Sequence, residues 1–198
     1  MEIKTFGIWE TSQIKVNDPG LIDFISVKPV HVPRTGARYA RNRFYKSKIH
    51  IVERLMNKVM VSGHKGKKHK ISSYANTGKA SQSYAIVVDS LKLIESKTKK
   101  NPVEVLVRAV ENAAPREEIV SIEYGGARYP KAVDCAPQRR IDVALRYMIQ
   151  GAYQKSFNSK RKASDTLAEE IINAASSSST SNAIAKKLEI ERQADTSR

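Results

Sequence analysis

The densest group of side chains able to do chemistry lies between residues 34 and 46, in the stretch RTGARYARNRFYK. Arginines alternate here with tyrosines and a phenylalanine. A guanidinium group can bind a phosphate through two parallel hydrogen bonds, and an aromatic ring can stack on an unpaired base. The alternation therefore predicts a surface for structured RNA. The residues expected to form it are Arg34, Arg38, Tyr39, Arg41, Arg43, Phe44, Tyr45 and Lys46.

Positive charge continues beyond this stretch. From residue 34 to residue 70 the only acidic side chain is Glu53. The whole protein has 35 Lys and Arg against 20 Asp and Glu, which gives a formal net charge of +15. Such a surplus favours a polyanionic partner, with nucleic acid ahead of an anionic membrane. Further phosphate contacts are expected from Lys48, Lys65, Lys67, Lys68 and Lys70.

A second candidate site is the stretch EEIVSIEYGGARYPKAVD, at about residues 117–134. β-Branched and aromatic residues flank Gly125-Gly126, and glycines adopt the positive φ values that tight hairpin turns need. We therefore predict a two-stranded β-hairpin. Because an isolated ribbon is only marginally stable, helices must support its base while the tip projects. The tip and the returning strand carry Tyr124, Arg128, Tyr129 and Lys131, which suit contact with a polyanion.

The elements that position these sites are predicted to be helices. Apolar side chains recur at helical spacing in several segments, so one face of each segment is expected to be buried. The helices are expected behind Asp18-Pro19, between Ser47 and Gly63, through Tyr84–Ile94, from Asn101 to Pro115, from Pro137 through Ala152, from Thr166 through Ile172 and from Asn182 onward. The predicted fold is mainly α: a helical bundle with a protruding two-stranded β-hairpin, an extended N-terminal arm and a C-terminal helix.

The chain is expected to divide into three parts. Residues 1–46 hold the arm, a short helix and the basic loop, and residues 47–175 hold the helical core with the hairpin. Residues 176–198 hold a flexible Ser-rich joint and the last helix, which has little apolar surface and is expected to gain order from a partner. RNA is likewise expected to order the arm and the basic loop.

Several local features carry their own predictions. Ser47 and Asn182 are candidate N-caps, and Thr166 with Glu169 has the spacing of a capping box. The segment GHKGKKHK is predicted to be a loop. Arg139 and Arg140 lie in the first turn of a helix, where cations oppose the helix dipole, so a phosphate is expected to compensate them. The arm residues expected to cover the core are Phe6, Ile8, Trp9, Ile14 and Val16.

Residue types argue against several other classes of protein. No apolar run is long enough to span a bilayer, and the N-terminus lacks the apolar core of a signal peptide. Cys135 is the only cysteine, so no internal disulfide is expected and a reducing compartment is favoured. It should be a packing residue, since no histidine is near it in sequence.

Catalytic and metal sites are not predicted either. His64 and His69 lie among lysines without a carboxylate or cysteine, and GHKGKK lacks the spacing of a phosphate-binding loop. Glu117 and Glu118 are expected to be solvated or to pair with Arg116. We therefore predict no catalytic residues, no cofactor, no metal and no small-molecule substrate.

With these residues in view, the sequence resembles the family of ribosomal protein seven of the small subunit, in its archaeal/eukaryotic form. The absence of a long N-terminal extension favours the archaeal form. The matching stretches follow the chain in order over nearly its whole length. They are FGIWETSQIKVNDPGLIDFISV, GARYARNRFYKSKIHIVERLMNKVM, NPVEVLVRAVENAAPREE, YPKAVDCAPQRRIDVAL, LAEEIINAA and SNAIAKKLEIERQAD.

The resemblance implies a cytoplasmic ribosomal protein that binds the 3′ major (head) domain of small-subunit rRNA, begins head assembly and lies at the E site, near tRNA and the emerging mRNA. Family partners include small-subunit proteins nine and eleven. By position, the family's rRNA contacts extend to Arg116, Arg139 and Arg140. The tip residues near the E site are Gly125, Gly126, Ala127 and Arg128, and Lys186 and Lys187 match the tail along the tRNA and mRNA exit path.

Two rival functions are weighed against this one. The first is a free basic regulator that binds nucleic acid outside the ribosome, which would remain soluble rather than sediment with the small subunit. The second is an RNA-modifying enzyme, which would need a cofactor loop or an acid–base cluster. Neither feature is found in the sequence.

Overall fold

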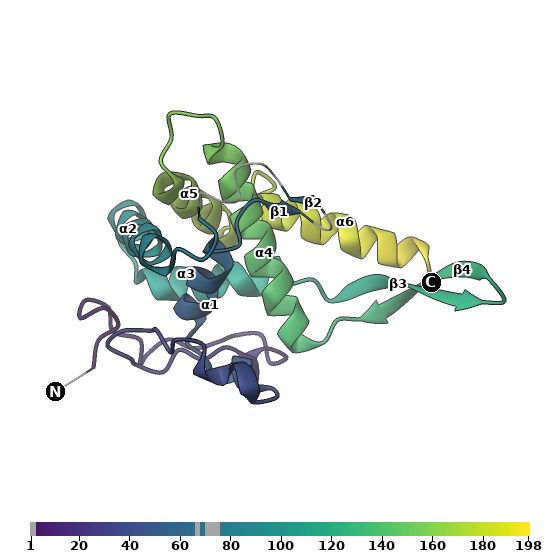
Figure 1. The fold of residues 1–198 in the computed structure, drawn as a ribbon, viewed down its shortest axis with the longest axis horizontal. Coiled ribbons are helices and arrows are strands. Elements are labelled where there is room, and N and C mark those ends of the chain that lie inside the picture. Colours follow the sequence, from purple (N-terminus) through teal and green to yellow (C-terminus); the bar gives the residue numbers. More distant parts are fainter. Residues whose placement is uncertain (1–2, 66–67, 70–75) are drawn as a thin grey trace.

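The computed structural model describes residues 3–65, 68–69 and 76–198, and Figure 1 shows a helical body from which a β-ribbon projects. The predicted fold class is confirmed. The helices are α1 (Ile51–Val59), α2 (Ala80–Thr98), α3 (Pro102–Ala113), α4 (Pro137–Ser156), α5 (Ala163–Ala175) and α6 (Asn182–Thr196). The strands are β1 (His64–Lys65), β2 (Lys68–His69), β3 (Glu117–Tyr124) and β4 (Ala127–Asp134), and three 3₁₀ turns are η1 (Ile22–Phe24), η2 (Arg38–Arg41) and η3 (Tyr45–Lys48).

The core lies among the six helices and the N-terminal arm, with α5 packed against α2, α3 and α4. Leu106 of α3, Leu145 of α4 and Ile171 of α5 are completely buried in it. Removing such side chains from water is the main force that holds the bundle together. Helix α3 starts as predicted, with Pro102 in its first turn and the side chain of Asn101 accepting a hydrogen bond from the Val103 amide at 3.0 Å.

The N-terminal arm packs over the helical body, as predicted. The Trp9 side chain is 3% exposed, and its indole N–H donates to Glu95 of α2 at 2.9 Å. Leu21 and Ile25 are also buried. These contacts fix part of the arm to the core. Ile8 is a correction to the prediction, since it is 48% exposed rather than turned to the core.

Three predicted helix starts are wrong. His50 caps α1 in place of Ser47, whose hydroxyl donates to the Phe44 carbonyl oxygen. Helix α5 begins at Ala163, ahead of the expected capping box. Ser181 caps α6, while the neighbouring asparagine is already helical. In each case several polar residues near the boundary are able to cap, and tertiary packing decides where the chain turns.

The segment 64–69, predicted to be a loop, pairs its ends as a short antiparallel ribbon of β1 and β2. Its backbone therefore has a defined register, with His64 opposite His69.

The last helix is part of the body, which corrects the expectation of an appendage. Ser181, at the end of the Ser-rich connection, donates from its hydroxyl to the buried Glu170 carboxylate at 2.8 Å. Ala183, Ile184 and Ala194 of α6 are buried. Gly151 of α4 makes this approach possible, since a Cβ there would lie 2.7 Å from the Cβ of Asn182. Small residues thus supply the close packing that a count of large apolar side chains misses.

Candidate nucleic-acid interface

The basic loop, residues 34–48, is folded as two 3₁₀ turns. Ala37 and Phe44 precede these turns with φ of 63° and 62°, a left-handed conformation that is uncommon for residues other than glycine. Phe44 is 74% exposed, and the Arg43 guanidinium lies 5.0 Å from its ring centroid. Tyr45 is 43% exposed, and the Lys48 ammonium lies 4.8 Å from its ring centroid. The loop therefore presents cations and rings together, as the sequence predicts.

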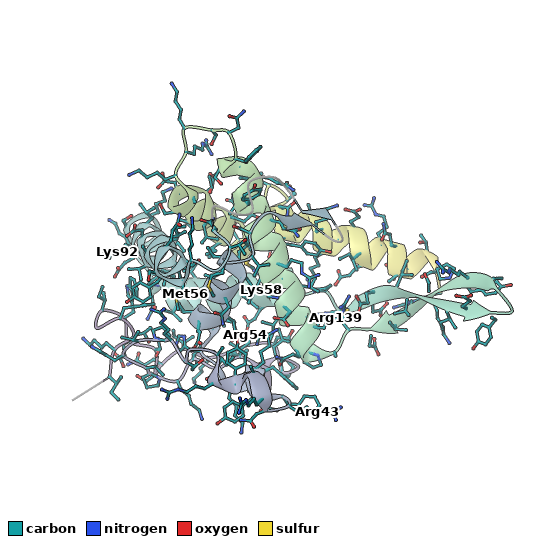
Figure 2. All side chains as sticks on the ribbon, viewed as in Figure 1. Arg43, Arg54, Met56, Lys58, Lys92 and Arg139 are labelled. Atoms are coloured by element: carbon teal, nitrogen blue, oxygen red, sulfur yellow. The ribbon has the colours of Figure 1, made fainter. Side chains whose placement is uncertain are left out.

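The arginines of this loop are not paired with any carboxylate of the described residues. Arg34, Arg38, Arg41 and Arg43 are all exposed, and within residues 3–65, 68–69 and 76–198 none of them forms an ion pair. Figure 2 shows Arg43 at the outer edge of the molecule. Several arginines elsewhere in the chain are paired instead. Arg54, Arg139, Arg140 and Arg161 each contact a carboxylate.

One carboxylate, Asp142 of α4, joins the basic loop to the body. Lys46 of the loop forms an ion pair with it, and from α1 the Arg54 guanidinium lies 3.3 Å and the Lys58 ammonium 3.7 Å away. Figure 2 shows Arg54 and Lys58 within the body rather than at its edge. Arg146, one turn along α4, is exposed beside this group.

The pKa values in this cluster follow from burial and charge. Burial acts to raise the pKa of Asp142, but the hydrogen bond from Lys46 and the charges of Lys58 and Arg54 hold it below its usual value. Burial lowers the pKa of Lys58. Asp142 opposes this, and the charges of Lys46, Arg146 and Arg54 add to it. Cations outnumber carboxylates here, so the neighbourhood stays positive. The sequence reading missed Asp142 and Arg146, although their i, i+4 spacing places them on one helix face.

The first turn of α4 is compensated internally, which corrects the expectation of a phosphate. Arg139 makes a two-point contact with Glu118 of β3, with nitrogen–oxygen distances of 2.5 and 2.6 Å. This hydrogen bond raises the pKa of Arg139. Arg140 donates to Asp18 at 2.8 Å and to the Pro115 carbonyl oxygen at 3.1 Å. Only 11% of the Arg140 side chain is exposed, so it holds the arm to the core.

The hairpin has the predicted turn. Gly125 and Gly126 adopt φ of 57° and 83°, and Tyr124 pairs with Ala127 across them. Alternate residues of a strand share a face, so Tyr124 lies on the same face as the pair Ile122 and Tyr129. Tyr124 and Tyr129 are 69% and 57% exposed.

The charged residues of the hairpin are also exposed. Arg128 lies 3.6 Å from Glu123 on the other strand, and both side chains are largely in solvent. Such an exposed pair contributes little to stability. Lys131 is exposed on the returning strand. The outer part of the hairpin thus offers aromatic and basic groups to a partner.

The hairpin base is tied to α6, and the two elements extend from the body side by side (Figure 1). The Arg116 amide donates to Glu191 of α6 at 3.0 Å, and its carbonyl oxygen accepts from the Cys135 amide at 2.8 Å. Arg198, at the end of the chain, pairs with Glu117. The sequence predicts that Glu117 and Glu118 are solvated or pair with Arg116. Both are instead partly buried and paired with other arginines, and the Arg116 side chain is exposed.

The remaining predicted site residues differ in whether their side chains are available to a partner. Lys186 pairs with Glu189 on the exposed side of α6, whereas Lys187 donates to the Asn112 carbonyl oxygen at the end of α3, at 2.9 Å. Lys65 and Lys68 belong to strands β1 and β2. The predictions for Lys67 and Lys70 fall outside the described residues.

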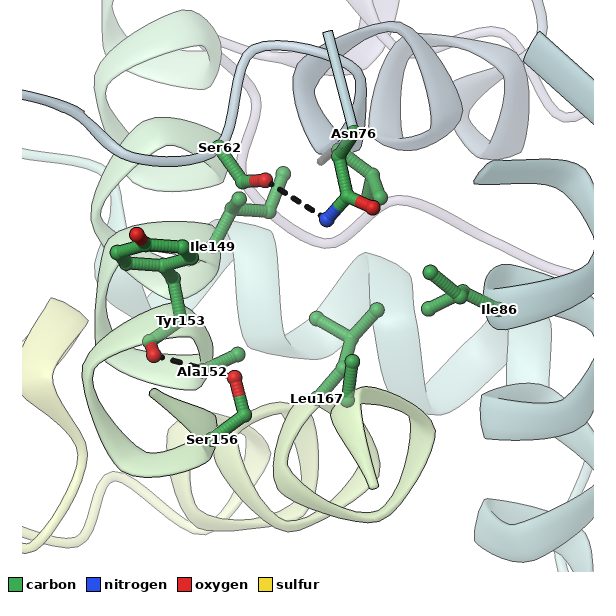
Figure 3. A pocket seen from close by; sticks show the side chains of 10 residues that line it. Ser62, Asn76, Ile86, Ile149, Ala152, Tyr153, Ser156 and Leu167 are labelled. Carbon is green, nitrogen blue, oxygen red and sulfur yellow. Dashed lines mark hydrogen bonds between the residues drawn. The ribbon is translucent and has the colours of Figure 1, made fainter. Parts of the chain in front are cut away.

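The single cysteine of the protein is not activated as a nucleophile. Burial raises the pKa of the Cys135 thiol to about 11, with Glu118 adding to the effect, which disfavours the nucleophilic thiolate. A hollow of about 30 Å³ between α1, α2, α4 and α5 is lined mainly by apolar side chains such as Ile149 and Leu167 (Figure 3). Such a volume holds little more than water.

The described residues also lack two other kinds of feature, a metal site and a membrane-spanning helix. No three His, Cys, Asp or Glu side chains there gather closely enough to hold a metal ion. None of the helices in the same residues has both the length and the apolar character needed to cross a membrane.

Comparison with known proteins agrees with the resemblance seen in the sequence. Residues 23–198 match the family described as Ribosomal protein S7p/S5e. The "Small ribosomal subunit protein uS7" of Nanoarchaeum equitans is 52% identical over 198 residues, covering all of both chains. The protein of the same name from Archaeoglobus fulgidus is 46% identical, covering all of this chain and 96% of the relative. That of Methanosphaera stadtmanae is 45% identical over 98% of each chain.

Proposed function

Because this chain belongs to the ribosomal protein S7p/S5e family and is a structural protein of the small ribosomal subunit, not an enzyme, we propose that it anchors the head of that subunit in the cytoplasm by binding the 3′ major domain of its rRNA. In this proposal the basic loop is the main anchor. The observation that carries it is the group of four exposed arginines without a carboxylate partner in the described chain.

The exposed arginines of the basic loop are informative because four of them, close together in sequence, have no carboxylate partner in the described chain, so the loop keeps a concentrated positive charge. A phosphate that replaces water at such a guanidinium releases condensed counterions from the RNA. Binding should therefore weaken steeply with salt, with a log–log slope of roughly −0.7 to −0.9 for each phosphate contacted. Exposed rings of the loop, such as Phe44, supply stacking for unpaired bases. Exposed Arg146 continues this surface onto α4.

The hairpin is assigned a different task. With its tyrosines exposed and its base fixed to the body, we assign its tip to the neighbourhood of E-site tRNA and mRNA. We assign Lys186, on the exposed side of α6, to the same tRNA and mRNA path. Lys187 donates to the Asn112 carbonyl oxygen, so its first role is to hold α6 to α3. Small-subunit proteins nine and eleven remain the proposed protein neighbours.

The anchor is tested with purified protein and two transcripts of equal length, one holding the 3′ major domain and one another rRNA domain. Replacing Arg38 and Arg41 by alanine should weaken binding to the first transcript by on the order of 1 kcal/mol for each residue. The matched control replaces Lys92 and Lys97, two exposed cations of α2, by alanine. Equal binding by the two double variants would contradict the anchor.

The tip is tested by shortening the hairpin across Tyr124–Tyr129. Head assembly should proceed, while E-site tRNA retention or reading-frame fidelity should change. A loss of rRNA binding would instead make the tip an anchor. Sedimentation separates the proposal from a free regulator, since the proposed protein travels with the small subunit.

A further inference from the structure

Asp142 is a carboxylate on a surface proposed to bind RNA, and its charge alone would repel phosphate. It contacts three cations from two different elements, Lys46 of the basic loop and Arg54 and Lys58 of α1. The sequence separation between Lys46 and Asp142 is 96 residues. The presence of a carboxylate on this surface must therefore have a cause other than attraction to RNA.

The contacts of the basic loop give that reason. In the described chain, three side-chain contacts join the loop to the helices. Near its start, the amide and hydroxyl of Thr35 donate to buried Glu53, at 2.9 and 2.5 Å. In its middle, Asn57 donates to the Tyr39 hydroxyl at a long 3.3 Å. Near its end the contact is the ion pair of Lys46 with Asp142.

We propose that Asp142 is a positioning residue of the RNA-binding surface, which holds the end of the basic loop against α1 and α4 so that its unpaired arginines are arranged before RNA arrives. This inference rests on the proposed function. A loop fixed in advance loses less conformational freedom on binding, and the contacts it makes are then stronger overall. Asp142 thus favours RNA binding through geometry while opposing it through charge.

The opposite signs of these two effects make the proposal testable. Asp142→Asn removes a negative charge, so simple electrostatics predicts tighter RNA binding. Positioning predicts binding weaker by about ten-fold, because the freed loop must be ordered again on binding. It also predicts a smaller slope of log affinity against log salt, since fewer phosphates are contacted at once. Asp89→Asn, at an exposed residue of α2, is the control for the change of charge and should leave affinity nearly unchanged.

A second measurement follows the loop without RNA. Amide hydrogen exchange in segment 34–48 of the free protein should speed up by about ten-fold in Asp142→Asn, as expected when a charge-assisted hydrogen bond is lost. Exchange in α3 and α5 should stay as in the unaltered protein. Since Arg54 is buried and needs its partner, Asp142→Asn can also loosen α1. Lys46→Met therefore serves as the second variant, because it frees the loop and leaves Arg54 paired.

Lys48→Met is the control for Lys46→Met, since it removes the same charge from an exposed residue of the same loop. Faster loop exchange and a larger loss of RNA affinity in Lys46→Met than in Lys48→Met support positioning. The inference is overturned if folded Asp142→Asn binds the 3′ major transcript as tightly as the unaltered protein does. It is also overturned if neither variant changes loop exchange. If the unaltered protein itself ignores that transcript, the proposed function fails, and the exchange data still decide whether Asp142 holds the loop.

Discussion

Replacing His50 by asparagine should remove much of the acid sensitivity of this protein. The His50 side chain is 5% exposed, and its Nδ1 accepts a hydrogen bond from the Val52 amide at the start of α1, at 3.2 Å. A protonated ring could not accept that bond. Burial lowers the pKa of His50 from 6.5 to about 4. The folded state therefore binds fewer protons than the unfolded state between these two values, and stability must fall as the pH falls through that range.

The size of the effect follows from the two pKa values. With 6.5 in the unfolded chain and about 4 in the folded one, the free energy of unfolding should drop by about 2.5 kcal/mol between pH 7.5 and pH 4.5. Asparagine can still cap the helix but does not titrate. Urea denaturation at both pH values should show this drop in the unaltered protein and lose it in His50→Asn. The exposed residue His31 gives the control, His31→Asn, which should keep it. Parallel pH dependence in the unaltered protein and His50→Asn would refute the reasoning.

Three further outcomes are expected. Gly151→Ala should lower the free energy of unfolding by about 1–3 kcal/mol because the new Cβ meets Asn182, and a higher melting temperature would contradict this packing. Arg140→Met should cost about 2 kcal/mol in urea denaturation, since Asp18 loses a largely buried partner. Unchanged stability with weaker RNA binding would mean that the guanidinium serves RNA. Cys135 should react with a thiol reagent about ten-fold more slowly in the folded than in the unfolded protein, because its raised pKa of about 11 lowers the thiolate fraction more than it raises the nucleophilicity of the thiolate, and equal rates would show an accessible thiolate.

The elements predicted correctly are those whose information is local. The spacing of Leu106 and Val110 reports the buried face of α3, and Gly125-Gly126 reports the hairpin turn, because both patterns extend over a few residues. The basic loop is likewise visible as a cluster in sequence. Its exposure in the structure follows from its composition, since charged side chains stay hydrated unless they are paired.

The features that sequence reasoning missed depend on distant partners. Arg140 finds Asp18 across 122 residues, so nothing near Arg140 in sequence indicates that its charge is already satisfied. The same holds for Lys46 and Asp142. The packing of helix α6 on the body is hard to predict for another reason. Its contacts use Ala183 and similar small side chains, which a search for large apolar residues overlooks.

The contacts from the base of the hairpin to Glu191 and Arg198 join the hairpin and α6 where both leave the body. A slender ribbon alone would bend where it leaves the bundle, but a helix fastened alongside resists that bending. The path of the hairpin is therefore expected to depend on residues far downstream, Glu191 in α6 and Arg198 just after that helix. A genetic screen for altered reach of the tip should accordingly recover substitutions at those two positions, even though neither one lies at the tip.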